Sequence, residues 1–376
     1  MNVLSTKTQD EPKLLAPEEF TNPTWSSRLT EVVTAAISTR GLRRLGVALG
    51  VYVVCLGLFA LLVLSQKANP FGVFNSIFQS ALFSNGSIPE VILRAVPIVL
   101  AALAVSVPAR AGLVNVGGEG QLIMGAVAAT GVGVYLGNSV PGFIGWICMG
   151  VAGFGAGAVW GGLAGLLRVL VNANEAVTTL LLNFIANDTM LYLLYQPWKD
   201  PTGGGQPESR PLSSHEVLPR LFGSSINLGV IIAMVAALVV WYLLKRSGWG
   251  FALRVVGGNQ QAASRAGLPV NRLRISSMAV GGGLAGLGGM LYLAGTQLQL
   301  LPGGTATYGY IAFLAAFLGR HDPFKVVLAG LLFAAIAVSA PGLQLSYGLD
   351  GNVVDALLAF IVVAPLVLSS RRKGAF

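Results

Sequence analysis

The sequence contains few charged residues. Only 10% of its 376 residues are Asp, Glu, Lys or Arg, whereas a soluble domain carries about 25%. Hydrophobic residues make up 54% of the chain. This balance excludes an ordinary soluble enzyme and predicts an all-α, polytopic protein of the lipid bilayer.

The residue types that perform metal and acid–base chemistry are also scarce. The chain has two histidines, His215 and His321, and two cysteines, Cys55 and Cys148, which lie in apolar runs. No metal centre, disulfide framework, bound cofactor or histidine-based catalytic site is therefore predicted. An intramembrane enzyme would need a nucleophile beside a base, and no such pair is visible. No GxxxxGK[ST] string is present, so any ATP must be hydrolysed by another chain.

Ten apolar segments approach the length of about 20 residues that a membrane-spanning helix needs. Their approximate bounds are 45–64, 90–108, 118–137, 142–167, 175–195, 226–244, 275–297, 303–319, 323–340 and 353–369. The alternative is eight full spans with the irregular, glycine-rich segments re-entrant. We expect a tail at 1–44, a transmembrane domain at 45–370 and a short tail at 371–376. Within the first tail, Trp25–Ser38 reads equally as an amphipathic helix or as disordered chain.

Basic residues alternate between the loops in a way that predicts orientation. Arginines precede the first segment and follow the last, which places both termini in the cytoplasm by the positive-inside rule. The net charge of +9 therefore reflects topology, and no nucleic-acid partner is expected. The predicted inner loops hold Arg110, Arg168, Lys245, Arg246, Arg254, Arg265, Arg272, Arg274 and Arg320. The largest outer loop, 196–225, is rich in proline and glycine and is either a plain surface loop or a docking surface.

Two glycine-rich, irregular strings occupy matching places in the two halves of the chain. They are GGEGQLIMGA at 117–126 and PGGTATYGYIAFLAAFLG at 302–319. An offset of five segments gives the two halves opposite orientation. Interrupted spans in inverted halves are typical of transporters whose substrate path runs along the interface between the repeats.

The first polar motif is the run ARAGLVNVGGEGQ at 109–121. A carboxylate and amides at the mouth of a span are costly in lipid unless they are used. Asn115, Glu119 and Gln121 are therefore candidates for the wall of a path for a polar solute. The structural alternative is that Glu119 caps a helix at its positive end.

The second polar motif is NEAVTTLLLNFIAN at 174–187. Thr179, Asn183 and Asn187 are four residues apart and share one face of a helix. This polar stripe should face the interior of the bundle, where it either lines the path or holds helices together.

The third motif is the basic, alanine-rich segment 250–274 within the predicted inner loop 245–274. Residues 259–266 predict about two helical turns, and their small alanines would allow close docking into a groove. An ordinary basic loop is the alternative. Candidate docking residues are Gly257, Asn259, Ala262, Ala263, Arg265 and Gly267.

The strings NVGGEGQ, NEAVTTLLLNFIA and GGNQQAASRAG, in this order and spacing, resemble the permease subunits of bacterial ABC importers for nucleosides. That group includes ribose and branched-chain amino acid permeases, and the resemblance covers about residues 88–370. It implies an inner-membrane permease that pairs with a second permease and two cytoplasmic ATPases, which use ATP. It also implies a solute-binding protein outside and a coupling helix within Gly257–Gly267. Gln260 departs from the resemblance, because many relatives carry proline there.

The candidate path residues are Asn115, Glu119, Gln121, Asn183, Asn187, Tyr308 and Tyr310, with Phe184 and Phe313 as ring faces for a base. The competing hypothesis is a secondary transporter driven by an ion gradient. It would need an ionisable relay deep in the membrane, for which Arg94, Glu119, Glu175, Asp188 and Asp355 are the candidates. The sequence leaves open which solute is carried and whether the paired permeases are identical.

Overall fold

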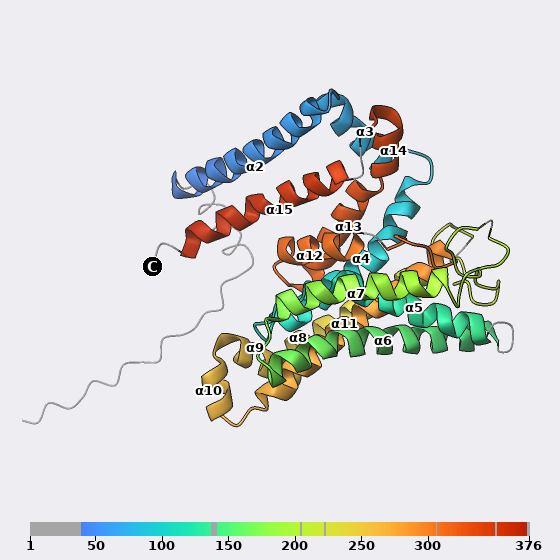
Figure 1. Ribbon diagram of the computed structural model, residues 1–376. Helices are drawn as coiled ribbons and strands as arrows, with labels where there is room; N and C mark the ends of the chain where they lie inside the picture. The colour runs from blue at the N-terminus through green and yellow to red at the C-terminus, as the bar shows by residue number, and fades with distance from the viewer. Residues whose placement is uncertain are drawn as a thin grey trace, which may run out of the picture. The chain divides into compact units, whose positions relative to one another are not determined.

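A computed structural model describes residues 39–136, 141–203, 205–221, 223–305, 307–349 and 352–373. The segment 25–38, for which the sequence left an amphipathic helix and disordered chain open, and most of the tail at 1–44 lie outside these ranges. Contacts divide the chain into residues 1–51 and 52–376, and the arrangement below concerns the second unit (Figure 1). The described part is helical, and its only β-type pairs are isolated bridges from Lys199 to Ser209 and from Arg220 to Asn227.

The helices follow one another in a simple order along the chain. They are α2 (Thr39–Ser65), α3 (Pro70–Leu82), α4 (Ser87–Ala109), α5 (Gly118–Leu136), α6 (Gly142–Leu170), α7 (Glu175–Tyr195), α8 (Gly229–Arg246), α9 (Gly248–Gly258), α10 (Gln260–Arg265), α11 (Val270–Tyr292), the π-helical turn η2 (Leu293–Gln297), α12 (Tyr308–Leu318), α13 (Pro323–Ala337), α14 (Ala340–Tyr347) and α15 (Asn352–Lys373).

Six helical segments of the described chain are long and apolar enough to cross a membrane. A seventh arises if Leu49–Ser65 and Pro70–Leu82, bent by 108° at their junction, form one span. The predicted segment 303–319 holds a shorter apolar helix, Tyr308–Leu318, whereas 353–369 lies within α15 (Asn352–Lys373). At 303–319 the hydropathy pattern includes loop residues that precede the short helix.

The helix α3 was not predicted. Its start is set by Asn69, whose side chain accepts a hydrogen bond from the Phe71 amide, and by Pro70 in the first turn. Proline is favoured there because the first helical N–H has no partner within the helix.

The helices α4 and α11 form the centre of the bundle, and both have 78% of their most apolar window buried (Figure 1). They are the corresponding elements of the predicted halves. Each is followed by a glycine-rich element that starts a shorter helix, α5 after α4 and α12 after α11. The order of elements is therefore the same in the two halves, and the inverted repeat stays a prediction.

A seam of glycines brings α6 against α11. A Cβ on Gly157 would collide with the Gly282 carbonyl oxygen and lie 2.8 Å from the Gly286 Cα. A Cβ on Gly161 would lie 3.0 Å from the Gly282 Cα. Such backbone approach is the usual way in which helices gain van der Waals contact in lipid, where the hydrophobic effect gives no advantage.

We expect Gly157→Ala to destabilise the protein, because the added methyl group overpacks this seam at a cost of about 1–3 kcal/mol. Gly155→Ala is the matched control on the same helix, since a Cβ there meets no atom within 4 Å. The measurement is the thermal melting temperature of the detergent-solubilised protein. Equal melting temperatures for the two variants would contradict the close contact of α6 with α11.

Candidate functional site

The start of α5 lies inside the bundle and is held by a buried amide network. The Asn115 side chain donates from Nδ2 to the Ala104 carbonyl of α4 at 3.1 Å and to Gln121 Oε1 at 3.0 Å. Gln121 Nε2 in turn donates to Asn115 Oδ1 at 3.1 Å, and that oxygen also accepts from the Gly117 amide at 2.9 Å. Asn115 and Gln121 are 0% and 1% exposed, so both amides are used within the protein.

Two side chains of α7 complete this network. Asn183 Oδ1 accepts from the Gly120 amide at 2.8 Å, and its Nδ2 donates to the Val116 carbonyl at 3.0 Å. Thr179 Oγ1 accepts from the Val116 amide at 3.1 Å. These bonds satisfy backbone groups that the interrupted helix leaves without partners. The structure thus joins Asn115, Gln121 and Asn183 in one network.

The predicted path residue Asn187 does not reach the network. It is half-buried one turn further along α7, and its Nδ2 donates to Asp188 Oδ1 at 3.5 Å. Phe184 also lies outside the network and is 60% exposed.

Glu119 links the two halves of the bundle. Its Oε2 accepts a hydrogen bond of 2.6 Å from the Gly309 amide in the first turn of α12. The two helix starts approach so closely that a Cβ on Gly118 would lie 3.3 Å from the Gly309 carbonyl oxygen. Glu119 is 6% exposed, and its Oε1 has no hydrogen-bond partner within the described residues. The Glu119 carboxylate therefore caps the start of α12, a helix of the other half.

A polar cavity of 340 Å³ lies beside the start of α12. It was missed because its members are scattered along the sequence and Tyr292 lies in an apolar run. Tyr292 and the predicted residue Tyr308 form an edge-to-face pair with ring centroids 5.2 Å apart. Tyr310 lines a neighbouring cavity of 300 Å³, which shares Thr307, Ile311 and Asp355 with the first. The polar lining consists of Arg94, Tyr292, Thr307, Tyr308, Asn352 and Asp355.

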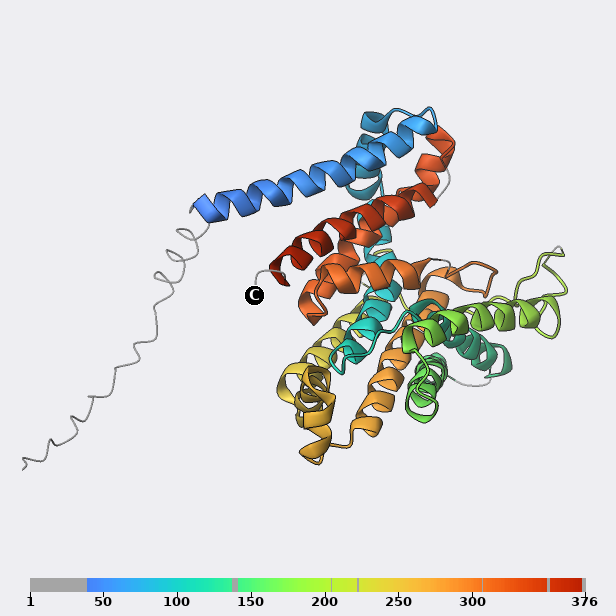
Figure 2. The same ribbon diagram turned by 60° about the vertical axis from the view of Figure 1, so that its left-hand side comes forward.

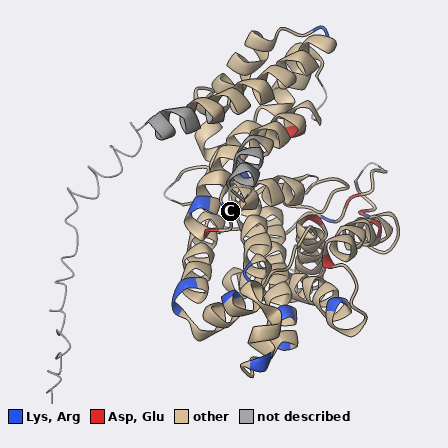
Figure 3. Ribbon diagram, turned by 90° about the vertical axis from the view of Figure 1, so that its left-hand side faces the viewer, with Lys and Arg blue, Asp and Glu red and all other residues tan. Residues whose placement is uncertain are grey.

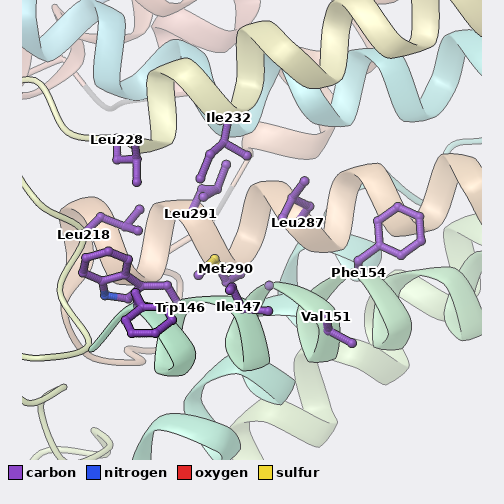
Figure 4. A pocket seen from close by; sticks show the side chains of 12 residues that line it. Trp146, Ile147, Val151, Phe154, Leu218, Leu228, Ile232, Leu287, Met290 and Leu291 are labelled. Carbon is purple, nitrogen blue, oxygen red and sulfur yellow. The ribbon is translucent and has the colours of Figure 1, made fainter. Parts of the chain in front are cut away.

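A larger cavity of 470 Å³ lies between α6, α8 and α11 (Figure 4). Figure 4 shows apolar side chains along its walls, including Ile147, Ile232 and Leu287. No charged or amide side chain lines it. Because a hydroxylated solute needs polar groups to replace water, this cavity is a poorer candidate for a solute site than the smaller polar one.

The predicted coupling segment forms two short helices, α9 and α10, at one end of the bundle (Figure 2). Asn259 begins α10 by accepting a hydrogen bond of 3.0 Å from the Ala262 amide. The helix therefore forms with Gln260 in the place where the resemblance leads us to expect proline. Within α10 only Ala263 is buried, at 0% exposure, while the other five residues are exposed.

The helix α9 contacts the turn that leads from α4 to α5. A Cβ on Gly257 would collide with the Arg110 carbonyl oxygen and lie 3.1 Å from the Gly112 amide. Gly112 itself has a φ of +75°, a left-handed conformation that glycine adopts without strain. The predicted coupling segment thus contacts Arg110 and Gly112, which precede the amide network.

Charged groups surround this contact. Arg110 Nη2 donates to the His321 carbonyl at 2.6 Å. Lys245 Nζ lies 2.8 Å from Asp322 Oδ2 and holds the pKa of that carboxyl below its usual range by hydrogen bonding and charge. Arg274 Nη2 donates to Gln260 Oε1 at 2.6 Å and ties α10 to α11. Figure 3 shows the gathering of basic residues at this end of the bundle.

Comparison with known proteins identifies the family. The family model described as "branched-chain amino acid transport system / permease component" matches residues 87–366. The chain is 33% identical over 312 residues to the glucose ABC transporter permease of Haloferax volcanii, covering 80% of this chain and 81% of the relative. It is 31% identical over 295 residues to the guanosine ABC transporter permease of Bacillus subtilis, covering 77% and 83%. It is 29% identical over 314 residues to the nucleoside ABC transporter permease of Lactococcus lactis, covering 81% and 85%. The chain therefore belongs to this family of transport-system permease components.

Proposed function

We propose that this protein is the membrane subunit of an ABC importer that carries nucleosides or a related small polar solute inward. The observation that carries the proposal is an exposed two-helix segment, α9 and α10, packed on the turn that leads to the buried start of α5. The guanosine and nucleoside permeases among the relatives favour a nucleoside, and the glucose permease extends the class to sugars.

The proposed complex contains two permeases, two ATPases that consume ATP, and an extracytoplasmic solute-binding protein. The basic α10 end faces the cytoplasm in this proposal, because cytoplasmic loops collect Lys and Arg. Both termini then lie in the cytoplasm of a bacterial cell, and the loop 196–225 lies outside. Described residues of that loop contact the chain after η2, where the Leu212 amide donates to the Leu298 carbonyl at 2.8 Å.

The proposed mechanism is alternating access driven from α10. Movement of α10 by the ATPase would pass through Gly257 to the turn at Arg110–Gly112 and from there to the start of α5. Because Glu119 joins α5 to α12, the two halves would move together. ATP changes the facing state only if the ATPase binds one state of the permease more tightly than the other.

The proposed path residues then fall into two groups. Asn115, Gln121 and Asn183 shape the wall, since their hydrogen-bonding groups hold the backbone in place. Glu119, Asn187, Tyr308 and Tyr310 remain as groups that a passing solute could meet. For α10, we assign docking to Asn259, Ala262 and Arg265, and we assign its support to Gly257, Ala263 and Gly267.

The direct test of the proposal is ATP-dependent uptake by the whole complex in proteoliposomes, with tritiated guanosine and radiolabelled glucose as probes. We expect uptake only with ATP and the binding protein present. Uptake that follows a proton or sodium gradient without an ATPase would overturn the proposal and favour a secondary transporter.

We expect Ala262→Trp to reduce uptake while the protein still folds, because Ala262 is exposed on the proposed docking face. Loss of about 1.4 kcal/mol of docking free energy would weaken ATPase binding roughly tenfold. The measurement is co-purification of the ATPase together with uptake. Val171→Trp is the control, since Val171 is 67% exposed and lies outside α10. Full uptake by the Ala262 variant would remove α10 from the docking face.

We expect Glu119→Gln to lower uptake more than it lowers protein yield, because glutamine keeps an acceptor for the Gly309 amide but removes the carboxylate. Glu119→Ala should lower the yield as well, since a buried amide without a partner costs about 1–3 kcal/mol. Yield and uptake are measured together, with Asp188→Asn as an exposed control on α7. Equal falls in yield and uptake for Glu119→Gln would leave Glu119 a purely structural role.

A further inference from the structure

The polar cavity beside α12 combines groups from four parts of the fold. Arg94 comes from α4, Tyr292 from α11, Thr307 and Tyr308 from the start of α12, and Asp355 from α15. The volume of 340 Å³ falls within the range of about 300–1,000 Å³ that is usual for small-molecule sites. The cavity lies near the end of α11 that contacts the loop 196–225, away from α10.

The chemistry of the lining suits a ring that carries hydroxyl groups. The Arg94 guanidinium offers donors, the Asp355 carboxylate offers acceptors, and the hydroxyl groups of Thr307 and the tyrosines can do either. The edge-to-face pair of Tyr292 and Tyr308 supplies an apolar wall. Gly303 and Gly304 form part of the lining without side chains.

The charges of the lining indicate a neutral occupant. Arg94 and Asp355 carry opposite charges. Arg94 also forms an ion pair of 2.8 Å with Glu90, so an incoming anion would compete with that carboxylate. A phosphorylated solute would bring about two further negative charges into this site, and no second Lys or Arg lines the cavity to receive them.

The backbone at the cavity connects it to the link between the halves. Thr307 has a φ of +74°, which is unusual for a β-branched residue. Thr307 and Tyr308 directly precede Gly309, whose amide is bound by Glu119. An occupant that contacts Thr307 or Tyr308 would therefore act directly beside the hydrogen bond that joins α5 to α12.

We infer that this cavity is the solute-recognition site of the permease and that it takes an uncharged, hydroxyl-bearing ring, as found in a nucleoside or a sugar. The inference rests on the proposed function and adds the site and the charge class of the solute. Arg94 and Asp355 thereby gain a recognition role in place of the ion relay that a secondary transporter would need.

The test is protection of an introduced cysteine from a small, negatively charged methanethiosulfonate reagent. The parent lacks both native cysteines (Cys55→Ala and Cys148→Ala), and the test variant adds Ala340→Cys, since Ala340 lines the cavity and is half-buried. The control variant adds Ser84→Cys, an exposed position in the turn before α4. Labelling is followed in the full complex with guanosine, glucose or guanosine monophosphate present.

We expect guanosine or glucose, at about ten times its dissociation constant, to slow labelling of the Ala340→Cys variant roughly tenfold. None of the three solutes should change the labelling rate of the Ser84→Cys variant. Guanosine monophosphate should also leave the labelling rate of the Ala340→Cys variant unchanged. Asp355→Asn in the Ala340→Cys background should weaken the protection. Which of the two neutral probes protects distinguishes a nucleoside from a sugar.

The outcomes separate the two proposals. If the cysteine-free parent takes up neither guanosine nor glucose with ATP, the proposed function fails. If the parent transports one of them but that probe leaves the labelling rate at Ala340→Cys unchanged, the function stands and this site is wrong. Protection by guanosine monophosphate equal to that by guanosine would overturn the neutral-solute assignment.

Discussion

The rest of the bundle depends on one constraint: the backbone amides at a helix start inside the membrane domain need hydrogen-bond partners. Lipid offers no hydrogen bonds, so the backbone amides at such a start must find partners within the protein. In this chain the amides of Val116, Gly117 and Gly120 are bound by side chains of Thr179, Asn115 and Asn183. At the start of α12, the Glu119 side chain likewise accepts a hydrogen bond from the Gly309 amide. The position of α5, α7 and α12 around the central helices follows from these bonds together with the glycine contacts.

Much of this could be predicted from the sequence, and the reasons are physical. A polar residue in an apolar segment is costly, so Asn115, Glu119, Gln121 and Asn183 were identifiable as buried and used. The segment 259–266 was predicted to form about two helical turns, and α10 forms there. What the sequence could not supply was the partner of each group. Glu119 binds Gly309 across 190 positions, and only the three-dimensional packing of α5 on α12 brings the two together.

The number of spans and the polar cavity were beyond the sequence for different reasons. Hydropathy adds the residues of a glycine-rich turn to the short helix that follows, so 303–319 read as a span although its helix begins at Tyr308. The cavity is built from single residues of α4, α11, α12 and α15. Thr307 and Tyr308 lie in the glycine-rich string 302–319, but no motif connects them with Arg94, Tyr292 or Asp355. Tyr292 follows an apolar run that predicts only a buried helix. In α10, Ala263 is buried and the adjacent Ala262 is exposed. The sequence alone does not distinguish these two alanines.

The amide network at the start of α5 has one further consequence. Asparagine, glutamine and threonine side chains carry no net charge, whereas a transmembrane voltage acts on each charge with about 2.3 kcal/mol per 100 mV. The voltage therefore exerts no direct force on the side chains of Asn115, Gln121, Thr179 and Asn183. Forces on these four side chains reach them through protein contacts.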